Sequence, residues 1–511
     1  MEYDDIVVGA GSSGAVLAAR LSEDSARNVL LLEAGPDYSA VDQTPSDLLH
    51  TWVSVGPHDW GLVAKATPDR EIAYPRGKVT GGSSAVNGHI AMRGTPEDFE
   101  EWAAWGNSEW SFAKVLPFYR KLENDRDADG DFHGTSGPIW IERPRTDRWQ
   151  PINRAFHEAC RELGYPDVWD HNDPRSTGIG PWPRNRREGI RVSTAIGYLH
   201  PARHRLNLTI RPFTNIHRVI VERGRAAGVE VECGGVVQTI RARRVTLSAG
   251  AINSPAILLR SGIGPRAELK ALGIESVADL PGVGRNLIDH LLVPVVATPT
   301  PGVPHDPRDT NAIGIRYTAN GSNEFNDMQM YIATYFDKSV VAGALFDLPV
   351  PSISLLAGLQ RPRARGRVSL RSADPNVPAA IDLNYVGDPE DMRRMVDGVR
   401  IAWRLMNSAR FAPYIKVFVN ITREVVESDS AAADFVRNNC TTIFHPTTTA
   451  KMGPDSDKEA VVDQYCRVRG VDGLRVVDAS VMPNIVRANT NLTCIMIGER
   501  AAEWMKAQEL G

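Results

Sequence analysis

The most constraining feature of this 511-residue sequence is a glycine pattern close to its beginning. Gly9, Gly11 and Gly14 lie between a strand expected over residues 5–10 and a helix expected over residues 15–22. Bare glycines let the backbone approach a pyrophosphate, and the positive end of a helix favours its negative charge. The pattern therefore predicts a βαβ unit that binds a dinucleotide.

A carboxylate follows the glycines at the distance that such a unit requires. A second strand, expected over residues 28–33, ends at Glu33, about twenty residues after the glycines. This side chain can accept hydrogen bonds from both hydroxyls of a ribose, and it disfavours the 2′-phosphate of NADP. NAD and FAD both fit these residues.

A second glycine-rich segment helps to separate these two cofactors. It contains Gly81, Gly82 and Ser83 and is followed by Asn87 and Gly88. Such a segment offers close backbone approach to another part of a large cofactor, which NAD enzymes rarely need. Taken alone, it fits a tight turn under packing equally well.

Bulk properties exclude several classes of protein. The formal charge of −4 and the pI near 6.3 give no basic field for nucleic acid. The five cysteines are widely spaced without a C-x-x-C pair, so we expect reduced thiols and no metal site. The chain has no basic leader and no apolar run that could span a bilayer. We therefore expect a cytoplasmic protein without membrane insertion, and the oligomeric state is not readable.

Several motifs in order resemble the glucose-methanol-choline oxidoreductase family of FAD flavoproteins, and the resemblance spans the whole chain. Residues 77–91 resemble the first signature of the family, and residues 250–264 resemble the second. Residues 280–290, LPGVGRNLIDH, and residues 474–483, LRVVDASVMP, are further landmarks. Within the second signature, Pro255 predicts the start of a helix. The resemblance implies FAD as cofactor and an alcohol as substrate.

The same resemblance, together with the strand and helix pattern, gives the expected architecture. The fold class is α/β, with a Rossmann-like FAD-binding domain and a second, substrate-binding lobe built on an antiparallel sheet with helices. The FAD-binding domain is expected to be discontinuous, over residues 1–150, 200–291 and 439–511. Residues 151–199 and 292–438 are assigned to the substrate-binding lobe.

The resemblance also implies which residues contact the cofactor. In relatives with covalently linked flavin a histidine stands where this chain has Val86, which has no nucleophilic nitrogen, so we expect non-covalent FAD. A helix starting around Leu492 would aim its positive end at the flavin N1–C2=O region, which also follows from the pattern alone. The implied contacts are Gly9, Gly11, Ser12, Ser13 and Gly14 at the pyrophosphate; Glu33 and Ala34 at the adenosine ribose; Gly81, Gly82, Ser83, Asn87, Gly88, His89 and Ile90 towards the flavin; Val219 at the adenine; Asp478 and Ala479 at the pyrophosphate and ribityl chain; and Thr490 and Asn491 at the pyrimidine edge.

His445 and Asn489 are the candidate catalytic pair. Hydride removal from an alcohol carbon requires a base for the hydroxyl proton, and imidazole has a pKa of about 6.5. Family members place this histidine, with a second histidine or an asparagine, over flavin N5. Asparagine cannot act as a base, so His445 is predicted to take the proton and Asn489 to orient the hydroxyl and stabilise the alkoxide. Phe444 and Trp60 are predicted walls of an apolar pocket.

Substrate and acceptor are less constrained. The second lobe offers apolar and aromatic residues such as Met330 and Tyr331, with no clear carboxylate cage for a quaternary ammonium. This favours an uncharged aryl or furanic alcohol over choline and leaves sugars open. Oxygen and another electron acceptor are not separated by the sequence. The alternatives are a non-redox lyase of the same fold that cleaves cyanohydrins, and a flavoprotein that uses light on fatty acids.

Overall fold

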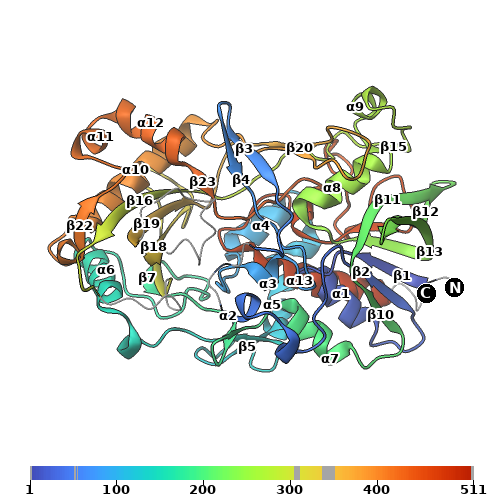
Figure 1. Cartoon of the computed structure of the whole chain (residues 1–511), viewed down its shortest axis with the longest axis horizontal. Coiled ribbons are helices and arrows are strands. Elements are labelled where there is room, and N and C mark those ends of the chain that lie inside the picture. The colour runs from blue at the N-terminus through green and yellow to red at the C-terminus, as the bar shows by residue number, and fades with distance from the viewer. Residues whose placement is uncertain (1–2, 51–52, 54–55, 304–310, 337–350, 508–511) are drawn as a thin grey trace.

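The computed structural model describes residues 3–50, 53, 56–303, 311–336 and 351–507. Figure 1 shows one sheet near the N-terminus, a second sheet at the opposite end of the long axis, and helices between and around them. The α/β fold class expected from the sequence is confirmed. Outside the described residues lie parts of the expected domains, namely residues 1–2, 51–52, 54–55 and 508–511 of the FAD-binding domain and residues 304–310 and 337–350 of the second lobe.

The predicted βαβ unit is present at the start of the chain. Strand β1 (Tyr3–Val8) leads into helix α1 (Gly14–Leu21) and then into strand β2 (Val29–Leu32). The two strands pair in parallel, with Val8 opposite Leu32. Every residue of β2 is buried, which is the pattern of a strand covered on both faces.

This unit belongs to a seven-stranded sheet assembled from distant parts of the chain. Its order is β10-β2-β1-β13-β12-β11, and β24 pairs with β13. The C-terminal half of β13 runs parallel to β1 and β24, while its N-terminal half runs antiparallel to β12. One long strand therefore joins a parallel layer to an antiparallel meander. The added strands are β10 (Leu208–Arg211), β11 (Thr214–Glu222), β12 (Arg225–Cys233), β13 (Val236–Leu247) and β24 (Leu474–Val476).

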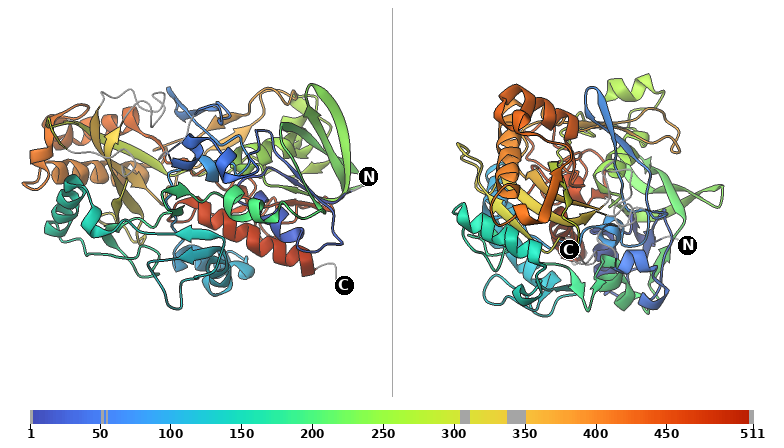
Figure 2. Two further views of the ribbon diagram at one scale, coloured as in Figure 1. Left: turned by 60° about the horizontal axis from the view of Figure 1, so that its bottom comes forward. Right: turned by 60° about the vertical axis from the view of Figure 1, so that its left-hand side comes forward.

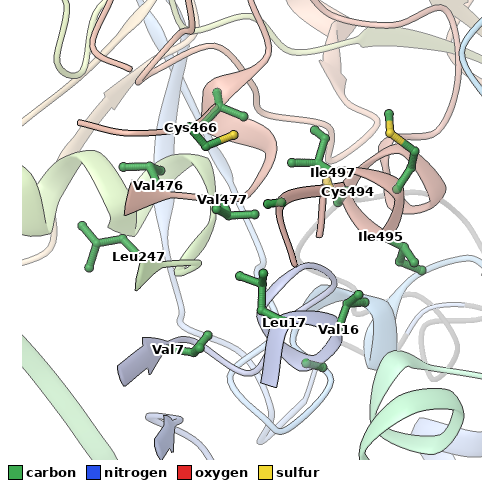
Figure 3. Packing of buried hydrophobic residues seen from close by; sticks show 14 of the residues in the cluster. Val7, Val16, Leu17, Leu247, Cys466, Val476, Val477, Cys494, Ile495 and Ile497 are labelled. Carbon is green, nitrogen blue, oxygen red and sulfur yellow. The ribbon is translucent and has the colours of Figure 1, made fainter. Parts of the chain in front are cut away.

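Helix α13 (Thr490–Ala507) packs across α1 and completes the first core. Its middle is buried on all sides, which explains why its sequence shows little amphipathic periodicity. Figure 3 shows Val16 and Leu17 of α1 in the same cluster as Ile495 and Ile497 of α13. Residues from the first and last parts of the chain thus share one apolar core.

The second sheet is antiparallel and has the order β22-β16-β19-β18-β17-β7, with β23 beside β16. Helix α10 (Pro389–Met406) packs on it; Asp388 caps this helix by accepting a hydrogen bond from the Glu390 N–H. Figure 2 shows α10 and α12 at the end of the molecule away from the N-terminus. The strands are β7 (Gly178–Pro181), β16 (Leu291–Pro299), β17 (Ile313–Tyr317), β18 (Met328–Phe336), β19 (Ser352–Leu359), β22 (Ile415–Phe418) and β23 (Thr441–Thr442).

Helix α8 (Gly250–Arg260) begins earlier than the sequence predicted. Pro255 lies inside the helix and not at its first turn, so the Ala251 carbonyl has no N–H from that residue. The Thr449 hydroxyl donates to this carbonyl at 2.6 Å instead. The proline is therefore tolerated because a distant side chain replaces the missing hydrogen bond.

The remaining elements surround these two sheets. Among the described residues, none of the helices is both long and apolar enough to cross a membrane. A four-stranded sheet consists of β3 (Val63–Thr67), β4 (Arg70–Ala73), β20 (Arg367–Ser369) and β21 (Ala380–Asp382), and the short pairs are β5 (Glu123–Asp125) with β6 (Ile139–Ile141), β8 (Arg186–Arg187) with β9 (Ile190–Arg191), and β14 (Ile263–Gly264) with β15 (Ala278–Asp279). The other α-helices are α2 (Ser46–His50), α3 (Ser83–Val86), α4 (Pro96–Ala104), α5 (Phe112–Leu122), α6 (Pro151–Glu162), α7 (His200–Ala202), α9 (Arg266–Ala271), α11 (Arg423–Glu427) and α12 (Asp429–Asn439).

Candidate active site

A cavity of about 700 Å³ is lined by residues from both large sheets. Its volume falls in the range of sites that bind small molecules and cofactors. It brings together most of the residues singled out in the sequence. Those that line it are Gly9, Gly11, Ser12, Ser13, Glu33, Ala34, Trp60, Gly82, Ser83, Asn87, Gly88, Ile90, Phe444, His445, Asp478, Ala479, Asn489, Thr490 and Asn491.

Four predicted cofactor residues do not line the cavity, and two of them are glycines that serve packing. A Cβ on Gly14 would lie 1.9 Å from the Gly9 carbonyl oxygen, so this glycine allows α1 to pack against the preceding turn. Gly81 donates its N–H to the Ala10 carbonyl at 2.8 Å and ties the two glycine segments together. Both residues shape the site without facing its interior.

His89 and Val219 are the other two exceptions. The His89 ring is buried, and its pKa lies well below the usual value because of burial and nearby arginines. Val219 uses its backbone N–H to donate to Ser261 Oγ at 2.8 Å, so this N–H is not available to an adenine. Ile216 and Asn215, three and four residues earlier on β11, line the cavity. The contact of Val219 with an adenine stays a prediction.

Glu33 lies at the end of β2 with its carboxylate held by the backbone. Ala10 N–H donates to one of its oxygens at 3.0 Å, and Gly35 N–H donates to the other at 2.9 Å. Burial raises the pKa of this carboxyl to about 7, although the backbone hydrogen bonds oppose the shift. Each oxygen retains lone pairs for a further donor such as a ribose hydroxyl.

The two glycine segments meet at the cavity. A Cβ on Gly82 would lie 2.7 Å from the Gly11 Cα, so the backbones approach as closely as glycine permits. Gly82 also has a φ of 51°, which favours glycine. A Cβ on Gly11, by contrast, would meet no described protein atom closer than 3.9 Å. The open space beside Gly11 is where a pyrophosphate approaches in such a turn.

The N-terminal end of α13 faces the same cavity. Thr490 and Asn491 occupy its first turn, and the Asn491 amide oxygen accepts a hydrogen bond from Ser12 at 2.8 Å. The positive end of this helix therefore adds to that of α1. The Asp478 carboxylate is fully used by donors from Gly250, Ser254 and Ser480, so its contribution is to hold the surrounding backbone.

His445 stands in a loop whose position follows from strand pairing. Leu291 of β16 pairs with Thr442 of β23, and the Thr447 N–H donates to the Ile288 carbonyl at 2.9 Å. Residues 288–292 thus run antiparallel to residues 441–447. The His445 Nε2 atom lies 3.3 Å from Asn489 Nδ2, and both residues line the cavity. The predicted pair is therefore brought together.

Asp289 anchors this loop from the opposite strand. Its Oδ1 accepts the His445 backbone N–H at 2.7 Å. Its Oδ2 accepts three hydroxyl hydrogen bonds, from Tyr74 at 2.8 Å, Tyr385 at 2.6 Å and Thr442 at 2.7 Å. Four donors thus converge on one buried carboxylate, and burial raises its pKa above the usual value.

His290 contacts the ring of His445. The two Nδ1 atoms are 2.9 Å apart, and the rings are nearly perpendicular at 87°. The pKa of His445 is held well below 6.5, first by burial and then by His290 and the Arg76 guanidinium. The imidazole is therefore neutral at neutral pH, the form that can accept a proton.

Sequence reasoning gave no functional role to Asp289 or His290. Both lie at the end of LPGVGRNLIDH, which was noted only as a family landmark. The signal was an acidic residue and a histidine directly before an apolar strand. The sequence alone did not reveal that residues 288–292 pair with residues 441–447. This pairing places both side chains against His445.

Cationic side chains line the cavity beside the predicted walls. Arg76 donates to the Phe444 carbonyl at 2.9 Å. The Lys78 ammonium lies 4.8 Å from the centre of the Trp60 ring, so one face of this aromatic residue already holds a cation. Among the described lining residues, the carboxylates are Glu33, which accepts one backbone N–H on each oxygen, and Asp478, which is fully used by its donors.

A buried charged cluster lies elsewhere in the chain. Oxygen and nitrogen atoms of Glu123, Asp125 and His133 lie within 4.8 Å of one another. Arg93 and Arg143 bind the two carboxylates. Burial lowers the pKa of His133, but hydrogen bonds to neighbouring carboxylates outweigh this and raise it to about 10. The cluster is an ion-pair network with its own internal cations.

Comparison with known protein families gives two matches along the chain. The models described as GMC oxidoreductase match residues 3–292 and residues 362–498. Together these ranges contain every residue that lines the cavity at the glycine turns and at the histidine and asparagine pair.

Individual proteins show the same likeness. The chain is 35% identical to an oxygen-dependent choline dehydrogenase of Brucella ovis, over 98% of this chain and 95% of that protein. It is 37% identical to an uncharacterized GMC-type oxidoreductase of Rhodococcus erythropolis, over 99% of each chain. Among solved structures, pyridoxine 4-oxidase from Mesorbium loti superposes with a TM-score of 0.90, at 30% identity and over 99% of each chain.

Proposed function

The chain belongs to the GMC oxidoreductase family, and on that basis we propose that it oxidises an uncharged primary or secondary alcohol to the aldehyde or ketone, with His445 as general base. It is an FAD-dependent enzyme of the alcohol oxidase or dehydrogenase type. The observation that carries the proposal is the approach of His445 Nε2 to the Asn489 amide at the wall of the cavity.

The residues of the cavity fit FAD. The open space beside Gly11 suits the pyrophosphate, and the Glu33 carboxylate suits the adenosine ribose. FAD, when bound, supplies the hydride acceptor at its N5 atom. With Val86 where a tethering histidine stands in some relatives, the cofactor is held without a covalent bond. Denaturing the purified protein would then release all of its yellow flavin into the supernatant.

The protein groups manage the proton and the oxygen. His445 Nε2 takes the hydroxyl proton, so that the carbon can lose hydride without building positive charge on a protonated carbonyl. The Asn489 amide orients the hydroxyl and donates to the alkoxide as it forms, which is worth about 3 kcal/mol for a positioned donor. Arg76 holds the loop through the Phe444 carbonyl and adds a nearby positive charge.

The charges in the cavity favour an uncharged substrate. The Brucella ovis relative is named for choline, a cation that needs aromatic faces or carboxylates. In this chain the face of Trp60 already holds Lys78, Arg76 is close to His445, and Glu33 and Asp478 are engaged by other donors. An aryl or heteroaryl alcohol, such as the substrate named for the Mesorbium enzyme, fits this wall better.

Anaerobic mixing with a panel of alcohols tests the proposal. Benzyl, furfuryl and pyridylmethyl alcohols should bleach the flavin absorbance, and choline should not. Rapid bleaching by choline alone would overturn the substrate class. No bleaching with any alcohol would overturn the oxidation itself and favour a non-redox lyase. Mixing the bleached enzyme with air then separates an oxidase from a dehydrogenase.

Two variants test the assigned roles. His445→Ala should retain FAD and lose most of its rate of flavin reduction, because it removes the proposed base. Asn489→Ala should be impaired less, since it removes a donor and leaves the base. A His445→Ala variant that reduces its flavin as fast as the wild type would contradict the base assignment.

A further inference from the structure

The contact between His290 and His445 raises a question of which nitrogen carries the proton. Their Nδ1 atoms are 2.9 Å apart, so one of the two must donate and the other must accept. A neutral imidazole has one N–H, and the hydrogen bond at one nitrogen decides the state of the other. The direction of this single bond therefore fixes whether His445 Nε2 has a free lone pair.

Asn489 favours one of the two directions. Its Nδ2 atom, which can only donate, faces His445 Nε2 at 3.3 Å. A donor opposite Nε2 requires a lone pair there, so the hydrogen of His445 belongs on Nδ1. That N–H then points at His290 Nδ1, which must accept.

The surroundings of His290 keep its ring neutral. Among the described residues, its ring hydrogen-bonds only to His445, and its Nε2 atom is buried without a partner there. His290 is fully buried, and burial lowers its pKa to about 3. It is therefore neutral near neutral pH, with one nitrogen able to accept.

We propose that His290 is a positioning residue: it accepts the Nδ1–H of His445 and thereby keeps Nε2 of His445 unprotonated, the form that can take the proton of the substrate hydroxyl. This inference rests on the proposed function, because it takes His445 to be the base. It also assigns a direction to each bond in the series from Asn489 through His445 to His290.

The same contact stabilises the state after proton transfer. The hydroxyl proton moves to His445 Nε2, the Nδ1–H stays in place, and the positive charge is shared with His290 through that hydrogen bond. The charged groups that act on the two rings are Arg76 on His445 and Arg361 on His290, with Asp289 bound to the His445 backbone N–H. Both arginines oppose a new positive charge on the histidines. The hydrogen bond to His290 therefore stabilises the protonated His445 against this repulsion.

Substitution of His290 by residues with and without an acceptor tests the proposal. In His290→Asn the side-chain oxygen can lie near the place of imidazole Nδ1 and still accept the His445 Nδ1–H. His290→Ala has no side-chain acceptor for this hydrogen bond. With FAD content unchanged, flavin reduction by the preferred alcohol should fall by about 100-fold or more in His290→Ala. His290→Asn should recover most of that loss, and the acid limb of its pH profile should stay close to that of the wild type.

A spectroscopic measurement reads the tautomer without turnover. In the FAD-bound protein labelled with ¹⁵N-histidine, the His445 signals, assigned by their loss in His445→Ala, should show a protonated Nδ1 and an unprotonated Nε2. In His290→Ala the Nε2–H form should become populated. This readout does not need an alcohol, so it remains decisive even if the panel of alcohols fails.

His171 provides a matched control. It is a buried histidine whose pKa is lowered to about 3 by burial, and it stacks on Trp182 without contacting His445. His171→Asn should leave the His445 tautomer unchanged. A protonated Nε2 in the wild type would overturn the proposal, as would wild-type reduction in His290→Ala or an equal loss in the Asn and Ala variants.

Discussion

Replacement of Asp289 by asparagine should move the catalytic base with little other change. Four donors converge on the two oxygens of this carboxylate: three hydroxyls on Oδ2 and the His445 N–H on Oδ1. An amide has one acceptor atom, so it cannot serve both sides. With the amide oxygen towards the three hydroxyls, the NH2 group lies against the His445 N–H and that hydrogen bond is lost.

The magnitude follows from that single bond. A hydrogen bond to a charged acceptor contributes about 1.5–3 kcal/mol, so the free energy of unfolding of Asp289→Asn should fall by about that amount. The three bonds that remain lose their charge assistance, but the amide also has no buried charge to desolvate, and these two effects oppose each other. Displacement of a catalytic group by about 1 Å costs about 100-fold in rate, which is the loss we expect in flavin reduction.

The assay pairs two measurements on the FAD-bound protein. Urea unfolding gives the change in stability, and anaerobic stopped-flow mixing with the preferred alcohol gives the rate of flavin reduction. Asp391→Asn is the control, because Asp391 is a buried carboxylate that binds two backbone N–H groups and Arg394 away from the cavity. It should lose comparable stability and keep its rate. Equal rates for Asp289→Asn and the wild type would refute the reasoning.

Three further results are expected. Glu33→Gln should weaken FAD binding by about 10- to 100-fold in titrations of the apoprotein, because an amide cannot accept from both backbone N–H groups and the ribose. Gly82→Ala should fold, as judged by circular dichroism, yet purify without flavin, since its Cβ would lie 2.7 Å from the Gly11 Cα. The rate of flavin reduction should stay constant as the pH falls from neutrality to 6.5 and decline only below it, because the pKa of His445 lies well below that value. Arg76→Met should shift this decline to higher pH, because Arg76 lowers the pKa of His445. A midpoint above 6.5 in the wild type would count against the assignment of His445 as the base.

Local signals in the sequence were sufficient for elements that depend on their own residues. The βαβ unit was predicted because its glycines, helix and strands are consecutive. The start of α8 was misplaced because Pro255 is normally a first-turn residue. Its tolerance inside the helix depends on Thr449, which is distant in the sequence and cannot be read from a local pattern.

The residues of the site also fall into those that a local motif predicts and those that depend on tertiary pairing. His445 and Asn489 were found because each stands in a recognisable motif, and the structure brings them within 3.3 Å. Asp289 and His290 were passed over because their role comes from pairing between strands. Val219 was predicted to contact the adenine, which stays a prediction, and Ile216 on the same strand was not singled out although it lines the cavity. Contacts set by register and pairing are tertiary facts that a single sequence does not contain.

The sheet that joins β1, β13 and β24 also has a consequence for biosynthesis. The first strand ends at Val8, and its sheet is not complete until Leu474–Val476 and α13 have been made. At the usual pace of translation, roughly half a minute or more separates these segments. The nascent chain must keep the apolar faces of β1 and α1 out of wrong pairings during that time, which is a natural task for a chaperone. The wall of the cavity formed by the start of α13 is therefore among the last parts of the site to be made.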